Sequence, residues 1–406
     1  MVSVAIMGHG VVGSGVAEIL LTHKQKLFAS LGEEIHIKKV LDLREFPDSP
    51  IAERFTKDFE EIINDREIRV VVEVMGGLNP AYDYVKRCLK AGKSVATSNK
   101  ELVAAHGAEL LQIAKEENVN FLFEASVGGG IPIIRPMNQC LVANNVNEVA
   151  GILNGTTNFI LTKMIEDGMQ FEDALKLAQD LGFAERNPAA DIEGHDACRK
   201  IAILSSLMCG KTVRYEDIPC EGISHISMLD VAYARSIGRA IKLLGVSQRD
   251  WQTGTFYVRT APYMVPASHP LHGVEDVFNA VFVHGNLVDN LMFYGRGAGK
   301  FPTASAVVSD MLDCALNIGE NIPIRWSDEK MELSDPALNA SRFFVRIHKK
   351  DLEKASGLFR GFKEVSLDSA PADEAAFTTG SMKESSFEDC AKQLSEVRQV
   401  IRLLED

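Results

Sequence analysis

The segment from Gly182 to Lys200, GFAERNPAADIEGHDACRK, carries the residue types in this chain that are best suited to chemistry. Several acidic residues surround a proline-containing turn, and a lysine follows where an apolar helical pattern begins. Asp196 and Lys200 are four positions apart and therefore share one helix face. Ile203 and Leu207 continue that face, which places the lysine head at the edge of a buried surface. The ordinary alternative is an isolated surface ion pair of ~0.3–0.5 kcal/mol, but the additional acids favour a site for a small substrate with an ammonium group and a reacting oxygen.

A glycine-rich turn near the N-terminus indicates a dinucleotide site. Residues 2–7 are typical of a strand, GHGVVG follows, and an apolar helical stripe comes next. The first glycine permits a tight turn, the second lets the backbone approach a pyrophosphate, and the third allows the helix to pack closely on the strand. The diphosphate would then lie at the helix N-terminus. The expected contacts are Gly8, Gly10, Val11, Val12 and Gly13.

Length and composition exclude several classes of protein. A chain of 406 residues is too long for one core and predicts two or three domains, while 46% hydrophobic and 24% charged residues are ordinary for a soluble globular enzyme. The net charge of −13 is spread along the chain, which argues against a nucleic-acid or membrane partner. The seven cysteines include no CxxC pair, so we expect reduced thiols in the cytoplasm.

Alternating strand and helix patterns up to about Gly130 predict an α/β fold with a doubly wound, Rossmann-type sheet. Loops at the carboxyl ends of its strands face the ligand. TSNKE follows the fourth strand, so Ser98 and Lys100 are expected at the cofactor crevice, although a lysine that begins an exposed helix would look the same. The predicted strands after the first are 35–43, 69–74, 94–97 and 121–125.

The pattern changes after Pro132 to a mixed α+β unit. A strand over 146–154 ends in NGTTN, and GRGAGK near Gly297, an expected cofactor contact, opens an apolar helix that should return to the nucleotide domain. Residues 328–340 are polar and read as a linker. Helices are predicted at 157–166, 171–182, 194–208 and 224–243, with strands at 255–260, 277–284 and 288–294. The expected domains are a dinucleotide-binding domain over 1–135 completed by a helix over 300–320, a substrate-binding and dimerisation domain over 136–297, and a small unit over 340–406.

Together these motifs resemble the homoserine dehydrogenase family. FEASVGGGIPII, GILNGTTNFILTKM, the acidic loop through DACRK, and GRGAGKFPTASAVV occur in the family's order, so the resemblance covers roughly residues 1–321. It implies reduction of L-aspartate 4-semialdehyde to L-homoserine with NADP or NAD, in the branch that leads to threonine and methionine. We expect a homodimer or homotetramer.

The resemblance also assigns residue roles. Glu185 and Asp191 would bind the substrate's amino group, and Asp196 would position Lys200, which exchanges a proton with the substrate oxygen. Lys100 matches a family lysine between cofactor and substrate and is the competitor for that role. The residues expected to line the substrate side of the crevice are Gly155 and Thr156.

A monovalent cation, sodium or potassium, is a further implication of the resemblance. Its ligands in the family are one glutamate carboxylate and backbone carbonyls, and a glycine-rich backbone suits a hard cation with oxygen ligands. From the residues alone, the three consecutive glycines favour a simple flexible turn, and the resemblance reverses that preference. The matching positions are Glu124, Val127, Gly129 and Ile131.

Residues 342–406 predict a βαββαβ order, which looks like the ACT domain appended to many family members. The loop at 348–351 lacks the glycine and proline expected where an amino-acid effector binds, which makes the unit a degenerate version. Threonine inhibition is therefore in doubt, and a structural or dimer-forming role is equally compatible. Truncation after Leu338 is expected to leave a soluble enzyme.

The residues leave the cofactor and two other functions open. Asp42 closes the second strand where an acid would bond the ribose 2′-hydroxyl, and Arg44 could pair a 2′-phosphate, so we expect use of both NAD and NADP. A different Rossmann oxidoreductase would lack NGTTN and the acidic loop, which are both present. A nucleotide-bound amino-acid sensor would bind the cofactor without turning over aspartate semialdehyde.

Overall fold

The computed structural model describes residues 1–405 and divides into two compact units. Unit 1 contains residues 1–144, 202–215 and 293–331, and unit 2 contains 145–201, 216–292 and the chain from Glu332 onward. Asp406, the last residue of the predicted small unit, lies outside the described residues. The division into domains at 1–135, 136–297 and 340–406 stays a prediction, because a compact unit can contain more than one folding domain.

The sheet of unit 1 is parallel, with β1 between β2 and β4. Its order β3-β2-β1-β4-β5-β6 is that of dinucleotide-binding sheets, which confirms the predicted doubly wound fold. All six residues of β1 are buried, as expected for a sheet covered on both faces. The strands are β1 (Val2–Met7), β2 (Ile35–Leu41), β3 (Phe55–Thr56), β4 (Ile68–Glu73), β5 (Ser94–Thr97) and β6 (Phe121–Leu122), and the helices of eight or more residues are α1 (Val11–Thr22), α2 (Lys24–Leu31), α4 (Ala81–Lys90), α5 (Lys100–Glu116) and α11 (Lys300–Leu316).

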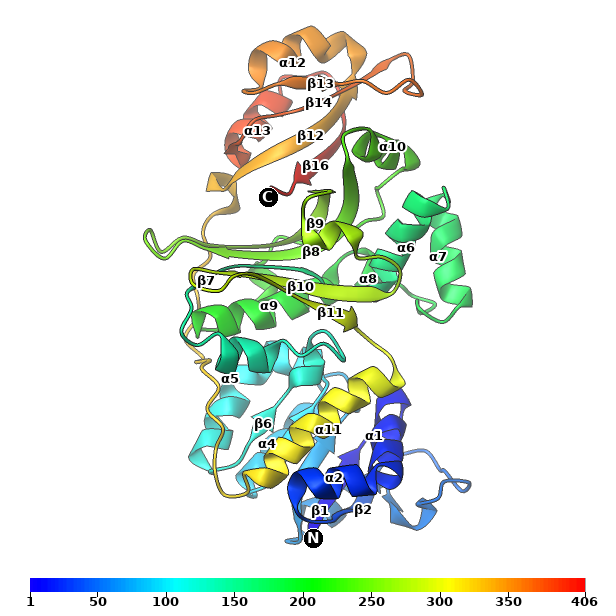
Figure 1. Ribbon diagram of the computed structural model, residues 1–406, viewed down its shortest axis with the longest axis vertical. Helices are drawn as coiled ribbons and strands as arrows, with labels where there is room; N and C mark the ends of the chain where they lie inside the picture. The colour runs from blue at the N-terminus through cyan, green and yellow to red at the C-terminus, as the bar shows by residue number, and fades with distance from the viewer. Residues whose placement is uncertain (406) are drawn as a thin grey trace. The chain divides into compact units, whose positions relative to one another are not determined.

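Helix α11 packs into unit 1 although it follows most of unit 2 in the sequence. Val307 and Met311 join the hydrophobic cluster that contains β1. Figure 1 shows α11, in yellow, beside α1, in blue, and the two helices contact each other. A Cβ atom on Gly15 of α1 would lie 3.0 Å from the Cβ of Ala304, so this approach depends on glycine.

Two predicted strands of unit 1 are too long, and β3 was not predicted. Strand β2 ends at Leu41 because the next side chain, Asp42, accepts backbone N–H groups instead of continuing the strand. Strand β6 ends at Leu122, and Glu124 begins a 3-10 turn. Both predicted strands therefore extend too far at their carboxyl ends, into residues whose side chains hydrogen-bond to backbone N–H groups.

Unit 2 is built on a ten-stranded mixed sheet that includes the C-terminal strands. The path is β11-β10-β7-β8-β9-β16-β12-β14-β13, and β15 pairs with β12 outside it. This confirms the predicted mixed sheet. The strands are β7 (Val146–Ile152), β8 (Arg239–Arg249), β9 (Phe256–Pro266), β10 (Phe278–Gly285), β11 (Asp289–Arg296), β12 (Ala340–His348), β13 (Lys363–Val365), β14 (Glu374–Thr378), β15 (Met382–Lys383) and β16 (Val397–Leu403).

The predicted helices lie close to observed ones with one exception, and the short helix α8 (Ala189–Ile192) was not predicted. The pattern predicts a helix over 224–243, but α10 ends at Ser236 and β8 begins at Arg239. Gly238 has φ +68°, a left-handed conformation that ends helices. Residues 240–247 are all buried, so this part of β8 lacks the alternation that identifies a half-buried strand. The helices are α6 (Gly155–Glu166), α7 (Phe171–Asp180), α8 (Ala189–Ile192), α10 (Met228–Ser236), α12 (Leu352–Leu358), α13 (Glu384–Ala391) and α9 (His195–Cys209), whose residues from 202 onward are counted in unit 1.

No helix in the described part of the chain combines the length and apolar character that crossing a membrane requires.

The C-terminal strands and helices follow the predicted order βαββαβ, with β12, α12, β13, β14, α13 and β16. Strand β16 pairs in parallel with β9, where Arg402 lies opposite Tyr263. Removing the chain after Leu338 would therefore take away a strand neighbour of β9. This pairing argues against a soluble truncated enzyme, and both the truncation and the ACT-like assignment stay predictions.

A buried ion network joins β16 and α13 to the rest of unit 2. The Glu384 carboxylate accepts hydrogen bonds from Arg402 Nε and Nη2, both at 2.9 Å, and from Arg259 Nη2 at 2.8 Å. Glu221 accepts from both arginines at 2.8–3.0 Å. Arg259 and Glu384 are only 4% and 6% exposed, so each charge depends on its partners.

We expect Glu384→Ala to lower the free energy of unfolding by about 3 kcal/mol, because it leaves two arginines with one partially exposed partner. Urea titration of the full chain measures this. Glu388→Ala, on the exposed face of the same helix, is the matched control and should leave the midpoint unchanged. Equal midpoints for the two variants would contradict a stabilising role for the network.

Candidate active site

Lys200 and Asp196 form a buried ion pair at the end of β7. Lys200 Nζ donates to Asp196 Oδ2 and to the Leu153 carbonyl, both at 2.7 Å. The two side chains are 11% and 5% exposed. Both belong to α9, four positions apart, so the pair occupies the helix face that the sequence predicts. A charged pair with so little solvent, at the edge of a loop, is a candidate site for proton transfer.

Asn154 connects this pair to the acidic loop, and the sequence analysis missed it. Its Nδ2 donates to Asp191 Oδ1 at 2.7 Å and to Asp196 Oδ2 at 2.9 Å. Its Oδ1 accepts the N–H of Thr157 at 2.8 Å and caps α6. An asparagine immediately before a helical pattern is a capping signal. That signal predicted the start of α6 but not the bonds to two carboxylates.

The other predicted substrate residues occupy different positions. Gly155 begins α6, and a Cβ atom there would lie 2.8 Å from the Val277 carbonyl oxygen, so packing requires glycine. Thr156 Oγ1 donates to the Phe183 carbonyl at 2.7 Å and ties α6 to the acidic loop. Glu185 is exposed, and no hydrogen bond or ion pair among the described residues joins its carboxylate to Asp191 or the lysine pair. The structure brings together the predicted Asp191, Asp196 and Lys200, but not Glu185.

The acidic loop is supported from behind by residues 220–223. Ile223 N donates to the Ile192 carbonyl at 2.8 Å. A Cβ atom on Gly222 would lie 2.3 Å from the same carbonyl oxygen, so the two segments are in close contact. Glu221, next in sequence, belongs to the buried network with Arg259 and Arg402. The position of the loop therefore depends on the C-terminal strand β16.

The glycine turn of unit 1 has the geometry expected of a diphosphate site. Gly8 has φ +97°, and a Cβ atom on Gly13 would lie 2.0 Å from the Gly8 carbonyl oxygen. A Cβ atom on Gly10 would meet nothing within 4 Å, which leaves room for a ligand. No side chain caps the N-terminus of α1, where Val11 is 67% exposed and Val12 half-buried. The free N–H groups there suit an anion.

Asp42 and Arg44 bind each other beside this turn. Arg44 Nε and Nη2 donate to the two oxygens of Asp42 at 2.9 and 2.8 Å, and His9 N donates to Oδ2 at 2.7 Å. The Arg44 guanidinium holds the pKa of the Asp42 carboxyl well below its usual range. The adjacent pocket of about 710 Å³ is lined by residues that include His9, Phe46 and Lys300, which the sequence analysis did not single out.

The loop after β5 is fixed by hydrogen bonds to the neighbouring strand end. Thr97 Oγ1 donates to Glu73 Oε2 at 2.6 Å, and burial raises the pKa of the Glu73 carboxyl. Asn99 caps α5, so Lys100 is the first residue of that helix and is half-buried. Ser98 N donates to the Glu73 carbonyl at 3.4 Å. Ser98 and Lys100 therefore lie at the carboxyl edge of the parallel sheet, as predicted from their position.

Gly297 packs against the segment of consecutive glycines. A Cβ atom on Gly129 would lie 2.4 Å from the Gly297 carbonyl oxygen, and Gly130 N donates to the Arg296 carbonyl at 3.2 Å. Gly297 therefore lies against the expected cation segment, and its role as a cofactor contact stays a prediction.

The Glu124 carboxylate binds backbone amides. Oε1 accepts the N–H groups of Ile133 and Ile134 at 2.6 and 2.7 Å, and Oε2 accepts that of Arg135 at 2.9 Å. Within residues 1–405, no three His, Cys, Asp or Glu side chains form a group that could hold a metal ion. The expected site relies on one carboxylate and on carbonyls instead. No described backbone amide donates to the carbonyls of Val127, Gly129 and Ile131.

The comparisons with known proteins agree over nearly the whole chain. Two family models match, "Homoserine dehydrogenase, NAD binding domain" over residues 8–124 and "Homoserine dehydrogenase" over residues 132–312. The homoserine dehydrogenase of Bacillus subtilis is 42% identical over 86% of this chain and 82% of its own.

Solved structures give the same family. A homoserine dehydrogenase from Thiobacillus denitrificans has a TM-score of 0.89 and 31% identity, covering 100% of this chain and 98% of that one. A hyperthermophilic archaeal homoserine dehydrogenase in complex with NADPH has a TM-score of 0.68 and 28% identity, covering 80% of this chain and 99% of the other. These relatives do not favour the sensor. The chain belongs to the homoserine dehydrogenase family of NAD(P)-dependent oxidoreductases.

Proposed function

We propose that this chain reduces L-aspartate 4-semialdehyde to L-homoserine with NADPH or NADH, within the biosynthesis of threonine and methionine. The observation that carries the proposal is the buried Lys200, bonded to Asp196 Oδ2 and the Leu153 carbonyl beside the acidic loop. An ammonium group in a site with little water stabilises negative charge on an oxygen more strongly than one in bulk solvent.

Asp191 and Glu185 are proposed to bind the substrate's ammonium group. Asn154 Nδ2 donates to Asp191 Oδ1 at 2.7 Å and orients this carboxylate, and a carboxylate is a strong acceptor for a charged donor such as an ammonium group. The exposed Glu185 would join only when the substrate is bound. A molecule without the amino group would leave these carboxylates unpaired, and this mismatch would reject it.

Lys200 is proposed as the proton donor. A bound nicotinamide would supply the hydride for the aldehyde carbon, and negative charge would then develop on the carbonyl oxygen. Lys200 donates a proton to that oxygen, so the products are an alcohol and a neutral amine, which solvent reprotonates. Asp196 stabilises the charged lysine before transfer and fixes its orientation through a 2.7 Å bond.

The residues of unit 1 fit the nucleotide. The turn from Gly8 to Gly13 leaves backbone N–H groups at the start of α1 for the diphosphate. Arg44 is exposed and could exchange Asp42 for a 2′-phosphate, whereas Asp42 could accept the hydroxyls of an unphosphorylated ribose. This interchange supports the use of both cofactors.

We also propose a monovalent cation, sodium or potassium, at Glu124 and the carbonyls of Val127, Gly129 and Ile131. Val127 and Ile131 are buried, and buried carbonyls need a donor or a cation. Two amides already occupy Glu124 Oε1, so its coordination would come from Oε2. The cation would fix the backbone between β6 and the segment that follows it.

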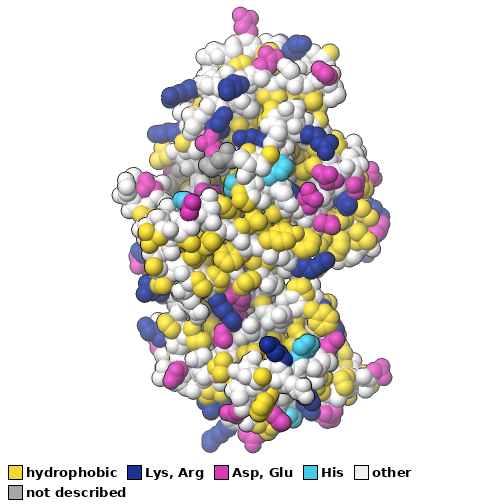
Figure 2. Space-filling model, in the orientation of Figure 1, with side chains coloured by type: hydrophobic (Ala, Val, Ile, Leu, Met, Phe, Trp, Pro, Cys, Tyr) yellow, Lys and Arg dark blue, Asp and Glu magenta, His cyan; other side chains and the backbone are white. Residues whose placement is uncertain are grey.

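A homodimer or homotetramer and a cytoplasmic location stay predictions. Hydrophobic side chains gather on the face of unit 2 where β7, β10 and β11 lie (Figure 2). On the part of β11 that belongs to unit 2, Met292 is 41% exposed. An exposed apolar face of this kind suits contact with another copy of the chain.

Lys200→Ala should lower kcat by about 10²–10⁴-fold while leaving NADPH affinity unchanged, because it removes the proton donor but none of the glycine turn. Lys100→Ala is measured beside it, in a cofactor-oxidation assay with aspartate semialdehyde. Asp191→Asn provides the contrast, because it removes one charged partner of the substrate. The lost charged hydrogen bond, of ~1.5–3 kcal/mol, should raise KM by about tenfold or more. The assignment is wrong if Lys200→Ala keeps more than about a tenth of the turnover and Lys100→Ala is inactive.

The wild-type enzyme should use NADPH and NADH with kcat/KM values that differ by less than about 100-fold. Arg44→Ala should lower the NADPH-to-NADH ratio by about tenfold, because the 2′-phosphate loses a charge-assisted partner and Asp42 becomes available to the ribose. Arg66→Ala, at another exposed arginine, is the control. An unchanged ratio in Arg44→Ala would exclude this arginine as the selecting residue.

Sodium or potassium chloride should raise the midpoint of thermal unfolding above that in tetramethylammonium chloride of equal ionic strength, because a ligand of the folded state stabilises it. Each kcal/mol of binding free energy corresponds to about 2–4 °C. Identical midpoints in the three salts at every concentration tested would refute the cation site. Turnover in the same salts then tells whether the cation also affects catalysis.

A further inference from the structure

A second pocket lies within unit 2, away from the residues proposed for catalysis. It has a volume of about 310 Å³ and is enclosed by α6, α10, β8 and the loop at 267–275. Glu166 on its edge and Gly155 of the substrate region are at opposite ends of α6, about 16 Å apart at 1.5 Å per residue. The size lies at the lower end of the range for small-molecule sites.

The inner wall of this pocket carries a buried lysine. Lys242 of β8 is 2% exposed, and its Nζ donates to the Val274 carbonyl at 2.5 Å and to Asn158 Oδ1 at 3.5 Å. Neither acceptor carries a negative charge, and no described carboxylate forms an ion pair with this amine. Burial lowers the pKa of Lys242 to about 8, while Glu275 and Glu166 act in the opposite direction. A buried ammonium without a counter-ion favours an anionic ligand.

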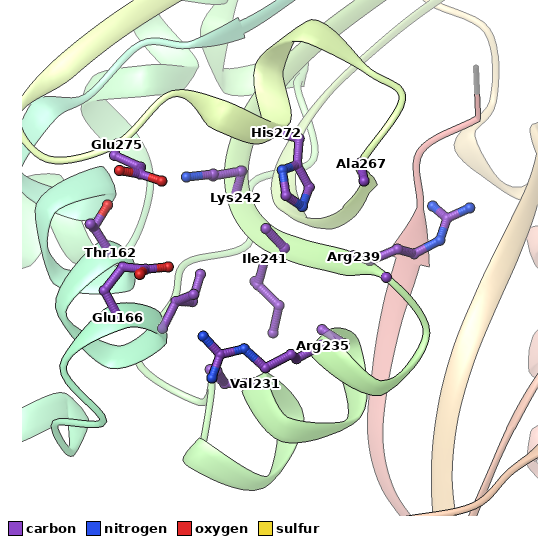
Figure 3. A pocket seen from close by; sticks show the side chains of 14 residues that line it. Thr162, Glu166, Val231, Arg235, Arg239, Ile241, Lys242, Ala267, His272 and Glu275 are labelled. Atoms are coloured by element: carbon purple, nitrogen blue, oxygen red, sulfur yellow. The ribbon is translucent and has the colours of Figure 1, made fainter.

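The rim of the pocket carries both signs of charge. Figure 3 shows Lys242 extending toward the side of the pocket where Glu166 and Glu275 lie, with Arg235 below them. These three rim residues are exposed, and none forms an ion pair with a charged side chain among residues 1–405. Acidic and basic groups thus face one small space without neutralising each other. An apolar wall completes it, formed by residues that include Ile165, Val231, Ala234 and Ile241.

These features distinguish between classes of ligand. A divalent cation would be repelled by Lys242 and would need more carboxylates. A nucleotide would overfill a space of this size and would meet Glu166 and Glu275 with like charge. A purely structural role accounts for the bond from Lys242 to Val274, but Asn158 Nδ2 also donates to that carbonyl at 3.2 Å. The carbonyl therefore does not require the lysine.

We propose that this pocket binds a free α-amino acid with a small side chain, at a site separate from the catalytic one. The carboxylate of the ligand accepts a hydrogen bond from Lys242 Nζ, and its ammonium group lies toward Glu166 and Glu275. The side chain packs on the apolar wall that Val231 and Ile241 provide. Binding involves no covalent step.

The wall formed by α10 links the pocket to the C-terminal strands. Asp230, in the first turn of α10, accepts a hydrogen bond from Arg346 of β12 at 2.7 Å and from Gln399 of β16 at 3.3 Å. Arg239, at the start of β8, donates to the Leu404 carbonyl at 2.7 Å. A ligand that orders this wall would therefore also act on the segment that follows β16.

Calorimetric titration of the full-length wild-type enzyme with glycine, L-alanine, L-valine and L-threonine tests the proposal. At least one should bind, and Lys242→Met should weaken it about 10- to 100-fold through loss of a charged hydrogen bond. Lys163→Met, at a half-buried lysine of α6 that pairs with Asp167 and does not line the pocket, is the matched control and should bind normally. Asp191→Asn should also bind normally, which separates this pocket from the catalytic site.

Two small-molecule probes and one variant at an exposed residue distinguish an amino-acid site from a simple anion site. Acetate and methylamine, which each carry half of the zwitterion, should bind at least about tenfold more weakly than the amino acid. Glu166→Gln, at an exposed rim position, should weaken binding of the amino acid but not of acetate. Equal affinity for acetate would identify a simple anion site and overturn the proposal, as would unchanged affinity in Lys242→Met or absence of binding by all four amino acids.

The pH dependence gives a further readout. Lys242 is charged below its pKa of about 8, and the groups that face it are Glu166, Glu275, Arg235 and His272, whose own pKa burial lowers. Affinity for the amino acid should fall as the pH rises through 8, because the lysine loses the proton that it donates. In Lys242→Met this fall should disappear, and its persistence would contradict the proposed contact.

Discussion

The buried ion pair of Lys200 and Asp196 is the interaction on which the rest of the site depends. Two charges at 11% and 5% exposure are stable only when every remaining hydrogen-bonding position around them is well used. At the end of β7, the Leu153 carbonyl accepts from Lys200 Nζ and the Asn154 amide donates to Asp196 Oδ2. The end of β7, the cap of α6 and the first turns of α9 must therefore meet at one point. If α9 moved by about an ångström relative to β7, one of the two charges would lose a hydrogen-bond partner.

A second buried charge network holds the acidic loop from the other side. Arg259 and Arg402 fix Glu221, and the neighbouring residues 222 and 223 pack on the Ile192 carbonyl. The C-terminal strand is thus part of the support of the loop that carries Asp191. This arrangement explains why β16 extends the sheet of unit 2 in place of forming a detached module.

The sequence predicted the parts of this structure that depend on local chemistry. Glycines with positive φ or close backbone contacts, such as Gly8 and Gly13, can be identified because no other residue fits there. The i, i+4 pair on α9 follows from helix geometry. The second half of the helix predicted over 224–243 failed because β8 is buried on both faces and shows no period of two. Asn154 could be recognised as a cap, but its bonds to Asp191 and Asp196 join residues 37 and 42 positions apart and depend on tertiary packing.

Cofactor binding and substrate binding in the proposed reaction depend on different features of the chain. Backbone N–H groups at the start of α1 would bind a diphosphate whatever the side chains are. Cofactor binding therefore depends mainly on glycines and can be predicted from a short motif. Recognition of an amino-acid substrate needs carboxylates whose geometry comes from distant elements, as the links through Asn154 and Glu221 illustrate. Lys242 belongs to the second kind. It lies in β8, which the sequence pattern predicted as a helix. Only the folded strand places Lys242 at the wall of a pocket that has no other assigned role.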